Sequence, residues 1–572
     1  MTNKQIKNLK DRLWEGADQL RANSGLKSTE YATPILGLIF LRFAESKYTK
    51  YEAEINAEFE KNKGSRAERA IHEIAVEKCG YYLPDKAKFD YLLNQPESVD
   101  LAKLTKEAME LIEKYTAELA DTLPKDIYYS VNSEDDPLVL AKLFRVFKDI
   151  PTDVSLDIFG EIYEYFLAKF ALAEGQGGGE FFTPSTVVRY MVETLNPTEG
   201  MIFDPACGSG GMFVQTAHYI ARHATKDKEI NLRAYGVEKT GATVKLAKMN
   251  LVLNNMRGTI THANSYYRDP YDSFEKFDYV MANPPFNVDD VELNQVKEQL
   301  RFNTYGVPQN KTKKAKGSAK ETVPNGNYLW INLFATSLKG TGRAALVMAN
   351  SASDAGHSEK DIRTEIINAG LISQMVTLPT NMFTSVTLPA TLWFFDRAKT
   401  KKDEILFIDA RNIFTQVSRA LRKFSDEQIK NLAIITRLYE GKTDEFAALI
   451  GEYKAEFAAA PEKSDDEDIK PKAYWQEQID WLTSRFPEGK YVNVIGLCKV
   501  AKLDGEDSIK DQDYSLNPGR YVGVVIEDDG LTEAEFKAQI LSLNAELSAL
   551  NAEAHEIEKR IADNLRRLVG DE

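Results

Sequence analysis

The sequence predicts an α/β protein with a Rossmann-like sheet, preceded by one helical region and followed by another. Three patterns predict this class. A short apolar strand runs into a glycine-rich turn and then a helix at residues 201–223. Short apolar runs alternate with helical stretches between residues 151 and 425, as the strands and helices of an α/β sheet do. Apolar residues three and four positions apart, a helical spacing, occur near both ends of the chain.

The bulk composition predicts an intracellular protein of several domains. A length of 572 residues suggests three or four domain-sized units, and 43% hydrophobic residues suffice for their cores. Three cysteines fit a reducing cytoplasm. The first residues lack the apolar core of a signal peptide. The longest apolar stretch, Ile35–Leu41, is far shorter than the roughly 20 residues of a membrane span. We therefore expect a soluble cytoplasmic protein without a membrane partner.

Residues 1–150 are predicted to form an N-terminal helical domain. The apolar residues with helical spacing include Ile6, Leu9, Leu13, Ala17 and Leu20. No catalytic pattern occurs in this region, so a contact surface for DNA or another subunit is the expected role.

A glycine-rich segment at 175–184 precedes the first strand of the predicted sheet. It is either a simple linker between domains or a lid that folds over the reactive end of a cofactor. In the second interpretation the cofactor-binding residues are Gly179, Glu180, Phe181, Phe182, Thr183 and Pro184. The dipeptide Thr183-Pro184 also marks the start of the next helix.

The glycine-rich turn after the strand at 201–203 predicts a nucleotide-type cofactor. Its candidate cofactor-binding residues are Asp204, Gly208, Ser209, Gly210 and Gly211. The turn departs from the dinucleotide pattern G-x-G-x-x-G, because no glycine lies three residues beyond Gly210. This departure argues against NAD and favours S-adenosylmethionine.

Two further strands are expected to place polar side chains beside the same cofactor. The strand at 233–237 ends at Glu238, and a carboxylate at that position can hold ribose hydroxyls. The strand at 258–262 leads to Asn264, near the expected position of the cofactor's adenine ring.

The strand at 277–282 ends in the tetrapeptide Asn283-Pro284-Pro285-Phe286, the candidate catalytic loop. Prolines fix the backbone and donate no hydrogen bonds, so the loop is stiff and presents acceptors. The Asn283 side chain and the Pro284 carbonyl suit the two hydrogens of a planar amine such as that of adenine, with Phe286 stacking on the ring. The competing interpretation is a proline-rich turn that only caps the strand.

The expected reaction at this loop depends on positioning. Two acceptors favour a more tetrahedral amine nitrogen, whose lone pair then points at the cofactor's methyl group. No general base is evident. A base must leave the duplex stack to reach the loop, at a cost of a few kcal/mol, and stacking on an aromatic ring returns about 1–3 kcal/mol.

Cysteine and metal chemistry are not expected. Cys207 lies within the glycine-rich turn, where a small residue packs closely, so we expect a structural role for it. Cys79 and Cys498 have no Cys or His neighbour at metal-ligand spacing. The sequence predicts neither a metal site nor a disulfide.

Together these segments resemble the modification subunits of type I restriction-modification systems, a family of adenine-N6 DNA methyltransferases. The order G-E-F-F-T-P, D-P-A-C-G-S-G-G, N-P-P-F is typical of one class of these enzymes. The resemblance covers roughly residues 5 to 525 and includes 13–21, 38–42, 157–167, 327–331 and 514–521. One departure is a lysine-rich insertion before Asn327.

The resemblance implies a reaction and a set of partners. The cofactor is S-adenosylmethionine, and the substrate is the N6 amine of adenine within a specific sequence of double-stranded DNA. The implied complex contains a DNA specificity subunit, a second copy of this chain and, optionally, a restriction subunit.

The net charge of −15 is unusual for a DNA enzyme, because DNA affinity comes largely from Lys and Arg at phosphates. Either a partner supplies the grip or the chain carries a local basic patch. The candidate patch follows the catalytic loop and contains Arg301, Lys311, Lys313, Lys314, Lys316 and Lys320. A solvated insertion with no role in DNA binding is equally consistent with the pattern.

The predicted methyltransferase domain spans residues 151–425, with later strands at 344–348, 374–378, 392–395 and 406–408. Residues 426–572 are predicted to be a helical C-terminal region that ends in a coiled-coil tail. Its seam is Ile540, Leu543, Leu547, Leu550, Ala554, Ile557 and Ile561. This stripe either packs on its own domain or binds a partner; the resemblance implies the specificity subunit.

Three other functions remain open at this point. A stand-alone adenine-N6 DNA methyltransferase would recognise its own site, but no target-recognition domain is evident. The same loop can hold a glutamine side-chain amide, as in protein glutamine methyltransferases, although the long helical flanks argue against it. A scaffold without turnover is disfavoured because Asp204, Glu238 and Asn283 are all present.

Overall fold

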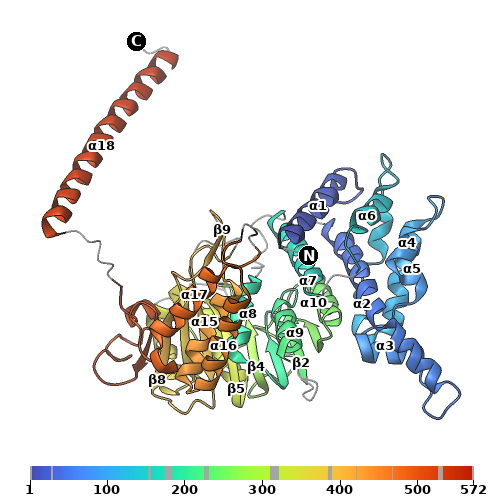
Figure 1. Ribbon diagram of the computed structural model, residues 1–572, viewed down its shortest axis with the longest axis horizontal. Helices are drawn as coiled ribbons and strands as arrows, with labels where there is room; N and C mark the ends of the chain where they lie inside the picture. The colour runs from blue at the N-terminus through green and yellow to red at the C-terminus, as the bar shows by residue number, and fades with distance from the viewer. Residues whose placement is uncertain are drawn as a thin grey trace. The chain divides into compact units, whose positions relative to one another are not determined.

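The computed structural model describes residues 3–27, 30–152, 156–173, 183–223, 231–309, 321–383, 389–419, 421–464, 466, 468–525 and 532–569. Contacts divide the chain into two units, Met1–Val522 and Gly523–Glu572. The first unit contains an N-terminal group of helices and a sheet with its covering helices (Figure 1).

The N-terminal region is helical, as the sequence predicts, and its helices share a buried core. Ile6, Leu9, Leu13 and Ala17 are all buried. The core also takes in Met249, Val252 and Leu253 from a helix that follows the second strand of the sheet. The helices are α1 (Asn3–Arg21), α2 (Ala32–Asn62), α3 (Ile71–Cys79), α4 (Phe89–Leu93), α5 (Leu101–Tyr115), α6 (Val139–Phe147) and α7 (Leu156–Ala173).

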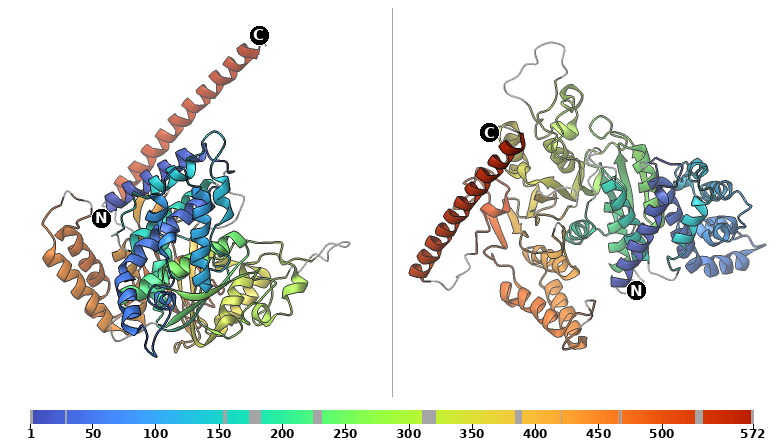
Figure 2. Two further views of the ribbon diagram at one scale, coloured as in Figure 1. Left: turned by 90° about the vertical axis from the view of Figure 1, so that its right-hand side faces the viewer. Right: turned by 90° about the horizontal axis from the view of Figure 1, so that it is seen from above.

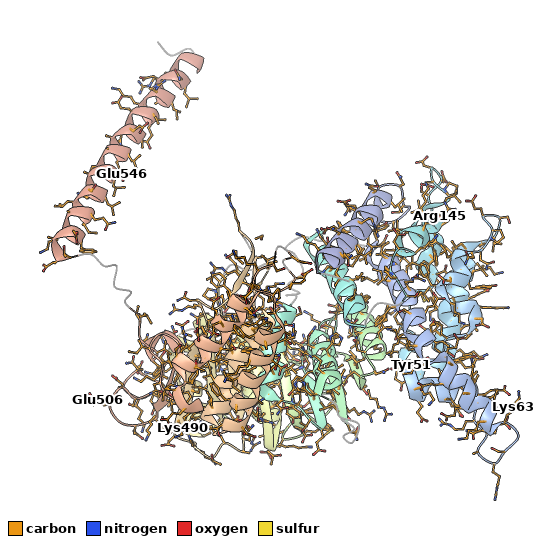
Figure 3. The ribbon with its side chains drawn as sticks, viewed as in Figure 1. Tyr51, Lys63, Arg145, Lys490, Glu506 and Glu546 are labelled. Carbon is orange, nitrogen blue, oxygen red and sulfur yellow. The ribbon has the colours of Figure 1, made fainter. Side chains whose placement is uncertain are left out.

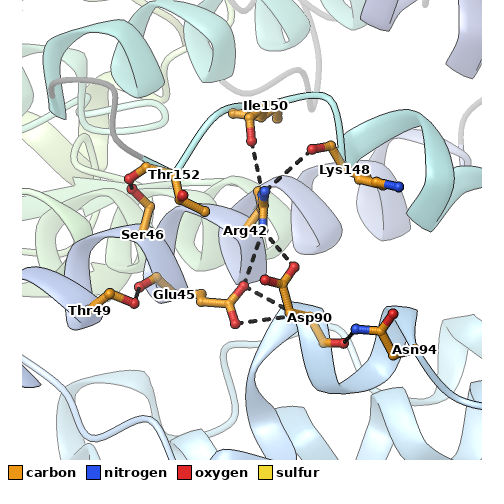
Figure 4. A network of polar contacts seen from close by, with 9 residues as sticks. All are labelled: Arg42, Glu45, Ser46, Thr49, Asp90, Asn94, Lys148, Ile150 and Thr152. Carbon is orange, nitrogen blue, oxygen red and sulfur yellow. Dashed lines mark hydrogen bonds and ion pairs between the residues drawn. The ribbon is translucent and has the colours of Figure 1, made fainter.

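A buried arginine holds this helical region together (Figure 4). Arg42 of α2 donates to the carbonyl oxygen of Ile150 at 3.1 Å and to Asp90 Oδ1 at 2.9 Å. It also pairs with Glu45 at 3.3 Å. Burial raises the pKa of Glu45, and the nearby Asp90 raises it further. The network ties α2 both to α4 and to the segment that leads into α7, because a buried charge needs such partners.

One mixed sheet of nine strands, in the order β11-β8-β6-β7-β5-β4-β1-β2-β3, forms the centre of the described part of the first unit. β7 and β11 run antiparallel to their neighbours, and the other strands are parallel. The strands are β1 (Gly200–Asp204), β2 (Leu232–Glu238), β3 (Arg257–His262), β4 (Phe277–Ala282), β5 (Leu338–Ala349), β6 (Ile372–Thr377), β7 (Ala390–Asp396), β8 (Glu404–Asp409) and β11 (Cys498–Lys502).

Helices cover both faces of the sheet (Figure 2). Alternate residues of β5 face opposite cores: Val347 packs into the core with α8, α9 and α15–α17, whereas Leu346 packs into the core with α13 and α14. The helices are α8 (Ser185–Leu195), α9 (Gly211–His223), α10 (Gly241–Leu253), α11 (Leu293–Val296), α12 (Leu300–Asn303), α13 (Asn327–Ser337), α14 (His357–Asn368), α15 (Asp426–Tyr439), α16 (Thr443–Ala459) and α17 (Lys472–Arg485).

The predicted strands all form, but the region after residue 426 is not entirely helical. β11 lies within it and pairs antiparallel with β8, from Cys498 opposite Ile408 to Lys502 opposite Glu404. This strand is five residues long, and its pattern differs little from that of the surrounding loops, so only its partner identifies it. A two-stranded hairpin, β9 (Thr415–Ser418) with β10 (Leu421–Lys423), also escaped the prediction.

The second unit contains the long helix α18 (Glu533–Val569), whose side chains extend on all sides (Glu546 in Figure 3). The predicted helix is confirmed. Its large apolar seam residues, among them Ile540, Leu547 and Ile561, are 48–57% exposed. Along the described residues no helix is long and apolar enough to cross a bilayer.

Candidate active site

The candidate site residues come together at one edge of the sheet. β4, β1, β2 and β3 are adjacent and parallel, so their carboxyl ends share an edge, where α/β proteins bind ligands. Asn283 follows β4, Asp204 ends β1, Glu238 ends β2, and Asn264 lies in the turn after β3. Gly179, Glu180, Phe181 and Phe182 lie outside the described residues.

The candidate catalytic loop, Asn283–Phe286, and the start of α8 are joined by one hydrogen bond. Asn283 Nδ2 donates to Thr183 Oγ1 at 3.0 Å. Pro184 follows as the residue that caps α8. Thr183, predicted on the cofactor side, therefore also contacts the loop predicted to hold the substrate.

The other end of the Asn283 amide has no partner. Oδ1 is covered by protein and accepts no hydrogen bond from any described residue. An unpaired buried acceptor costs about 1–3 kcal/mol, and a catalytic role is one of the explanations for such a group in a native protein. Because Oδ1 is covered, a substrate amine reaches it only after the atoms around it move.

Asn325 and Asn327, which the sequence analysis did not assign to the site, hold the candidate catalytic loop in place through Asn287. Asn287, which follows Phe286, has a φ of 56°. Its backbone N–H donates to Asn327 Oδ1 at 2.8 Å, and its Oδ1 accepts from Asn327 Nδ2 at 3.0 Å and from Asn325 Nδ2 at 3.1 Å. Asn327 begins α13 and is 3% exposed. In the sequence, the only indication of this role was that a polar residue, Asn327, stands at the start of an apolar helical run.

The glycine-rich turn has the conformation that its sequence requires. Gly208 and Gly210 have φ values of 51° and 86°, which residues with a side chain rarely adopt. Gly208 N–H donates to Glu238 Oε2 at 3.1 Å, and Thr240 N–H donates to Oε1 at 2.7 Å. The carboxylate is thereby fixed beside the turn.

A helix behind the turn supports it through an asparagine that the sequence analysis missed. Asn250 Nδ2 donates to the carbonyl oxygen of Ser209 at 2.7 Å. Asn250 is 6% exposed and lies on α10, within an apolar run. A buried amide in such a run needs a partner, and here the partner is the backbone of the turn.

Asp204 is a buried carboxyl group at the end of β1. It is 1% exposed, and its Oδ1 accepts from the backbone N–H of Ala206 at 2.9 Å. Burial holds the pKa of Asp204 well above its usual range, and the charge of Glu238 raises it further. Nearby, Ser265 Oγ donates to the carbonyl oxygen of Pro205 at 2.5 Å and so joins the turn after β1 to the turn after β3.

The turn leaves room for a cofactor. A Cβ atom added to Gly208 or Gly211 would meet no atom of the described residues within 4 Å, so these residues leave space beside both glycines. The space is bordered by the Glu238 carboxylate through its bond to Gly208. A carboxylate at the end of the second strand, a glycine backbone beside it and Asn264 after the third strand are polar groups that suit a nucleoside-containing cofactor, and they fit S-adenosylmethionine.

Neither Cys207 nor Arg301, a member of the predicted basic patch, is placed to react or to bind DNA at this edge of the sheet. Cys207 is buried, and burial holds its thiol pKa well above the usual range, so it is a poor nucleophile. Arg301 is 5% exposed and donates to the carbonyl oxygen of Tyr266 at 3.3 Å. Burial lowers the pKa of Arg301 to about 10. The prediction that Arg301 belongs to an exposed DNA-binding patch is therefore wrong. The lysines of that patch, at 311–320, lie outside the described residues.

Comparisons with known proteins match nearly the whole chain. Residues 154–529 match the family described as N-6 DNA Methylase, and residues 9–148 match the HsdM N-terminal domain. The chain is 31% identical over 576 residues to the type I restriction enzyme MjaIX methylase subunit of Methanocaldococcus jannaschii, covering 98% of this chain and 91% of the relative. It is 33% identical over 511 residues to the HindI methylase subunit of Haemophilus influenzae, covering 87% and 97%.

A solved structure has a similar fold. It is the type I restriction-modification system methyltransferase subunit from Streptococcus thermophilus, with a TM-score of 0.64 and 18% identity. The match covers 91% of this chain and 100% of that one.

Proposed function

Because the chain belongs to the N-6 DNA methylase family, we propose that the loop Asn283–Phe286 binds the adenine amine while the turn Asp204–Gly211 holds the cofactor. The protein is the methylase subunit of a type I restriction-modification system and transfers a methyl group from S-adenosylmethionine to adenine N6 in DNA. In the proposed site, each half holds one of the two reacting molecules in a fixed orientation.

The unpaired Oδ1 of Asn283 carries the proposal. It accepts one hydrogen of the adenine amine, and the Pro284 carbonyl accepts the other. Two acceptors on one nitrogen draw it toward a tetrahedral geometry, so its lone pair is directed out of the ring plane. The bond from Asn283 Nδ2 to Thr183 supports this role, because it holds the amide with Oδ1 away from Thr183.

The proposed reaction also requires that the target adenine leave the stacked bases of the DNA duplex. Phe286 is partly buried between the two cores of the sheet, which fixes its ring. Stacking of the extruded adenine on this ring returns about 1–3 kcal/mol, comparable with the few kcal/mol of unstacking. Asn287, held by Asn327, keeps the loop from following the base outward.

The cofactor half is formed by Glu238, the glycine-rich turn and Asn264. Glu238 holds the ribose hydroxyls, and the backbone of Gly208–Gly211 lies along the methionine portion. When bound, S-adenosylmethionine supplies a methyl group on a positively charged sulfur. The methyl carbon would bond to the amine nitrogen as its bond to sulfur breaks, which would release S-adenosylhomocysteine, and the methylated amine would lose one proton to water. The protein's task is therefore orientation.

The acidic chain is proposed to work with partners. Its net charge of −15 opposes unaided binding to DNA, which supports a separate DNA specificity subunit. The exposed apolar seam of α18 supports a contact with that subunit. A second copy of the chain and an optional restriction subunit complete the proposed complex, which acts on DNA in the cytoplasm.

The alternatives are less well supported. Relatives named as type I methylase subunits cover nearly the whole chain, which does not favour a stand-alone DNA methyltransferase or a protein glutamine methyltransferase.

The test is base-resolved mapping of methyladenine in a host that expresses the chain with its specificity subunit. We expect a mark at a two-part site for the wild type and none for Asn283→Ala. Asn431→Ala, a buried asparagine on α15 that contacts Gln478 and Tyr453, is the matched control and should retain the mark. A mark that persists in Asn283→Ala refutes the assigned role of the loop, and a contiguous site favours a stand-alone enzyme.

A further inference from the structure

A basic hairpin extends from the same edge of the sheet as the catalytic loop. β8 is parallel to β6, β6 and β5 both run antiparallel to β7, and β5 is parallel to β4. β8 and β4 therefore end at the same edge. The hairpin β9–β10 follows β8 directly, and Figure 1 shows β9 extending beyond the elements around it.

The hairpin concentrates positive charge in an acidic chain. No Asp or Glu occurs from residue 410 to residue 425. The basic residues of this stretch are Arg411, Arg419, Arg422 and Lys423. Arg411 is neutralised by Asp409, which accepts from its Nε at 2.9 Å. Arg419 and Lys423 are exposed and form no ion pair with any residue in the described ranges.

Arg422 fastens the hairpin to the loop that follows β6. Its backbone N–H donates to the carbonyl oxygen of Asn381 at 2.8 Å, and its Nη1 donates to Thr380 Oγ1 at 3.0 Å. Its guanidinium lies 3.8 Å from the centre of the Phe414 ring. These contacts fix the direction of the hairpin backbone that carries Arg419 and Lys423 before any partner binds.

The base of the hairpin lies against the helix that touches the catalytic loop. Phe424 N–H donates to Thr186 Oγ1 at 3.5 Å, and Arg189 pairs with Asp426 at 2.8 Å. Thr186 and Arg189 belong to α8, which begins just after Thr183, the partner of Asn283. A short chain of contacts thus links the hairpin to the loop proposed to hold the target base.

We propose that the β9–β10 hairpin binds DNA phosphates beside the extruded adenine through Arg419 and Lys423. This inference rests on the proposed function, because it takes the Asn283 loop as the position of the target base. Fixed positive charges next to that loop hold the backbone from which the base is drawn. They also allow the chain to bind DNA phosphates although its net charge is negative.

The test compares two double variants in the complex with the specificity subunit. Arg419→Gln/Lys423→Gln removes the hairpin charges, and Arg257→Gln/Lys402→Gln removes two exposed charges at the starts of β3 and β8, on the opposite edge of the sheet. DNA affinity is measured by fluorescence anisotropy between 50 and 300 mM KCl, roughly the range in which phosphate contacts dominate.

The hairpin variant is expected to bind cognate and unrelated DNA more weakly by the same factor. Its log–log salt slope should fall by about 2, one unit for each lost phosphate contact. The control variant should match the wild type, and the charge-preserving exchange Arg419→Lys/Lys423→Arg should keep the slope. All variants should bind S-adenosylmethionine as the wild type does.

Two results would overturn the inference. One is a salt slope equal to that of the wild type in the hairpin variant. The other is loss of assembly with the specificity subunit, seen by size-exclusion chromatography, which would assign the hairpin to a protein partner. A wild-type complex that does not methylate DNA would instead overturn the proposed function, so the two failures are distinguishable.

Discussion

The side-chain amide of Asn250 donates to the carbonyl oxygen of Ser209 across 2.7 Å, which joins helix α10 to the glycine-rich turn. The same helix ends at Leu253, whose carbonyl oxygen accepts from Lys47 Nζ of α2 at 2.8 Å. α10 therefore contacts the glycine-rich turn at one position and the N-terminal helical region at another. The helical region thus supports this turn through α10.

Asn250→Ala is expected to weaken S-adenosylmethionine binding about tenfold, because one hydrogen bond of roughly 1.4 kcal/mol no longer fixes Ser209. The rate at saturating cofactor should change little, since the catalytic loop is untouched. Isothermal titration calorimetry measures the affinity. Asn431→Ala, which removes a similarly buried amide away from the turn, should leave it unchanged; an equal loss in both variants would mean a general loss of folding.

Asn283→Ala is expected to lower kcat by about 10²–10³-fold, the usual effect of removing one fixed polar contact from a reacting group. Cofactor affinity should remain within about twofold, because Asn283 does not belong to the glycine-rich turn. Transfer of a radioactive methyl group to cognate DNA gives the rate. A normal kcat with a weaker DNA affinity would assign Asn283 to binding alone.

Thr183→Val is expected to slow methyl transfer roughly tenfold in a single turnover, since Asn283 Nδ2 loses its acceptor and the amide is free to rotate. Thr183→Ser keeps the hydroxyl and should retain most of the rate. If both variants react at the wild-type rate, the hydroxyl does not orient the amide.

Lys47 predicts a pH dependence of stability. It is 0% exposed, and burial lowers its pKa to about 7 from its ordinary 10.5. Between these values the unfolded chain binds more protons than the folded one, so stability rises with pH above about 7. The slope is at most about 1.4 kcal/mol per pH unit.

Lys47→Met is expected to remove that rise and to destabilise the protein by about 1–3 kcal/mol, because Leu253 O and Asn255 Oδ1 lose their donor. Urea unfolding at pH 7.0 and 8.5 measures the difference between the two proteins. The difference should be larger at pH 8.5. An equal difference at both values would mean that Lys47 stays charged across this range.

The sequence was sufficient for β1, β2 and β4, because each is an apolar run that ends at an acidic residue or a proline pair. The strand ending at Asn283 and the turn at Gly208 are examples, and their meeting at one edge follows from parallel pairing. The contacts that hold them were not predictable. Asn250 and Asn327 act across 41 and 40 residues of sequence, and no local pattern encodes the partner of a buried amide.

β11 and the burial of Arg301 were not predicted for the same physical reason, which is that they depend on contacts between distant parts of the sequence. β11 is a strand because β8 offers it an open edge, not because of its own composition. Arg301 resembled a surface charge by its neighbours in sequence, yet the fold places it beneath the segment at Tyr266. Both depend on tertiary contacts, which outweigh local preference.

The bond between Asn283 and Thr183 determines whether the amide of the proposed substrate-binding loop offers an acceptor or a donor. A carboxamide is nearly symmetrical in shape, and the hydroxyl that accepts from Nδ2 decides which end is turned toward the ligand. In the proposed site Oδ1 is the unpaired end of the amide. Once the atoms that cover it move, a base that presents a keto oxygen would meet lone pair against lone pair and be repelled. If the loop binds the target base as proposed, thymine and the O6 edge of guanine are disfavoured by electrostatics, whereas the amino group of cytosine is not.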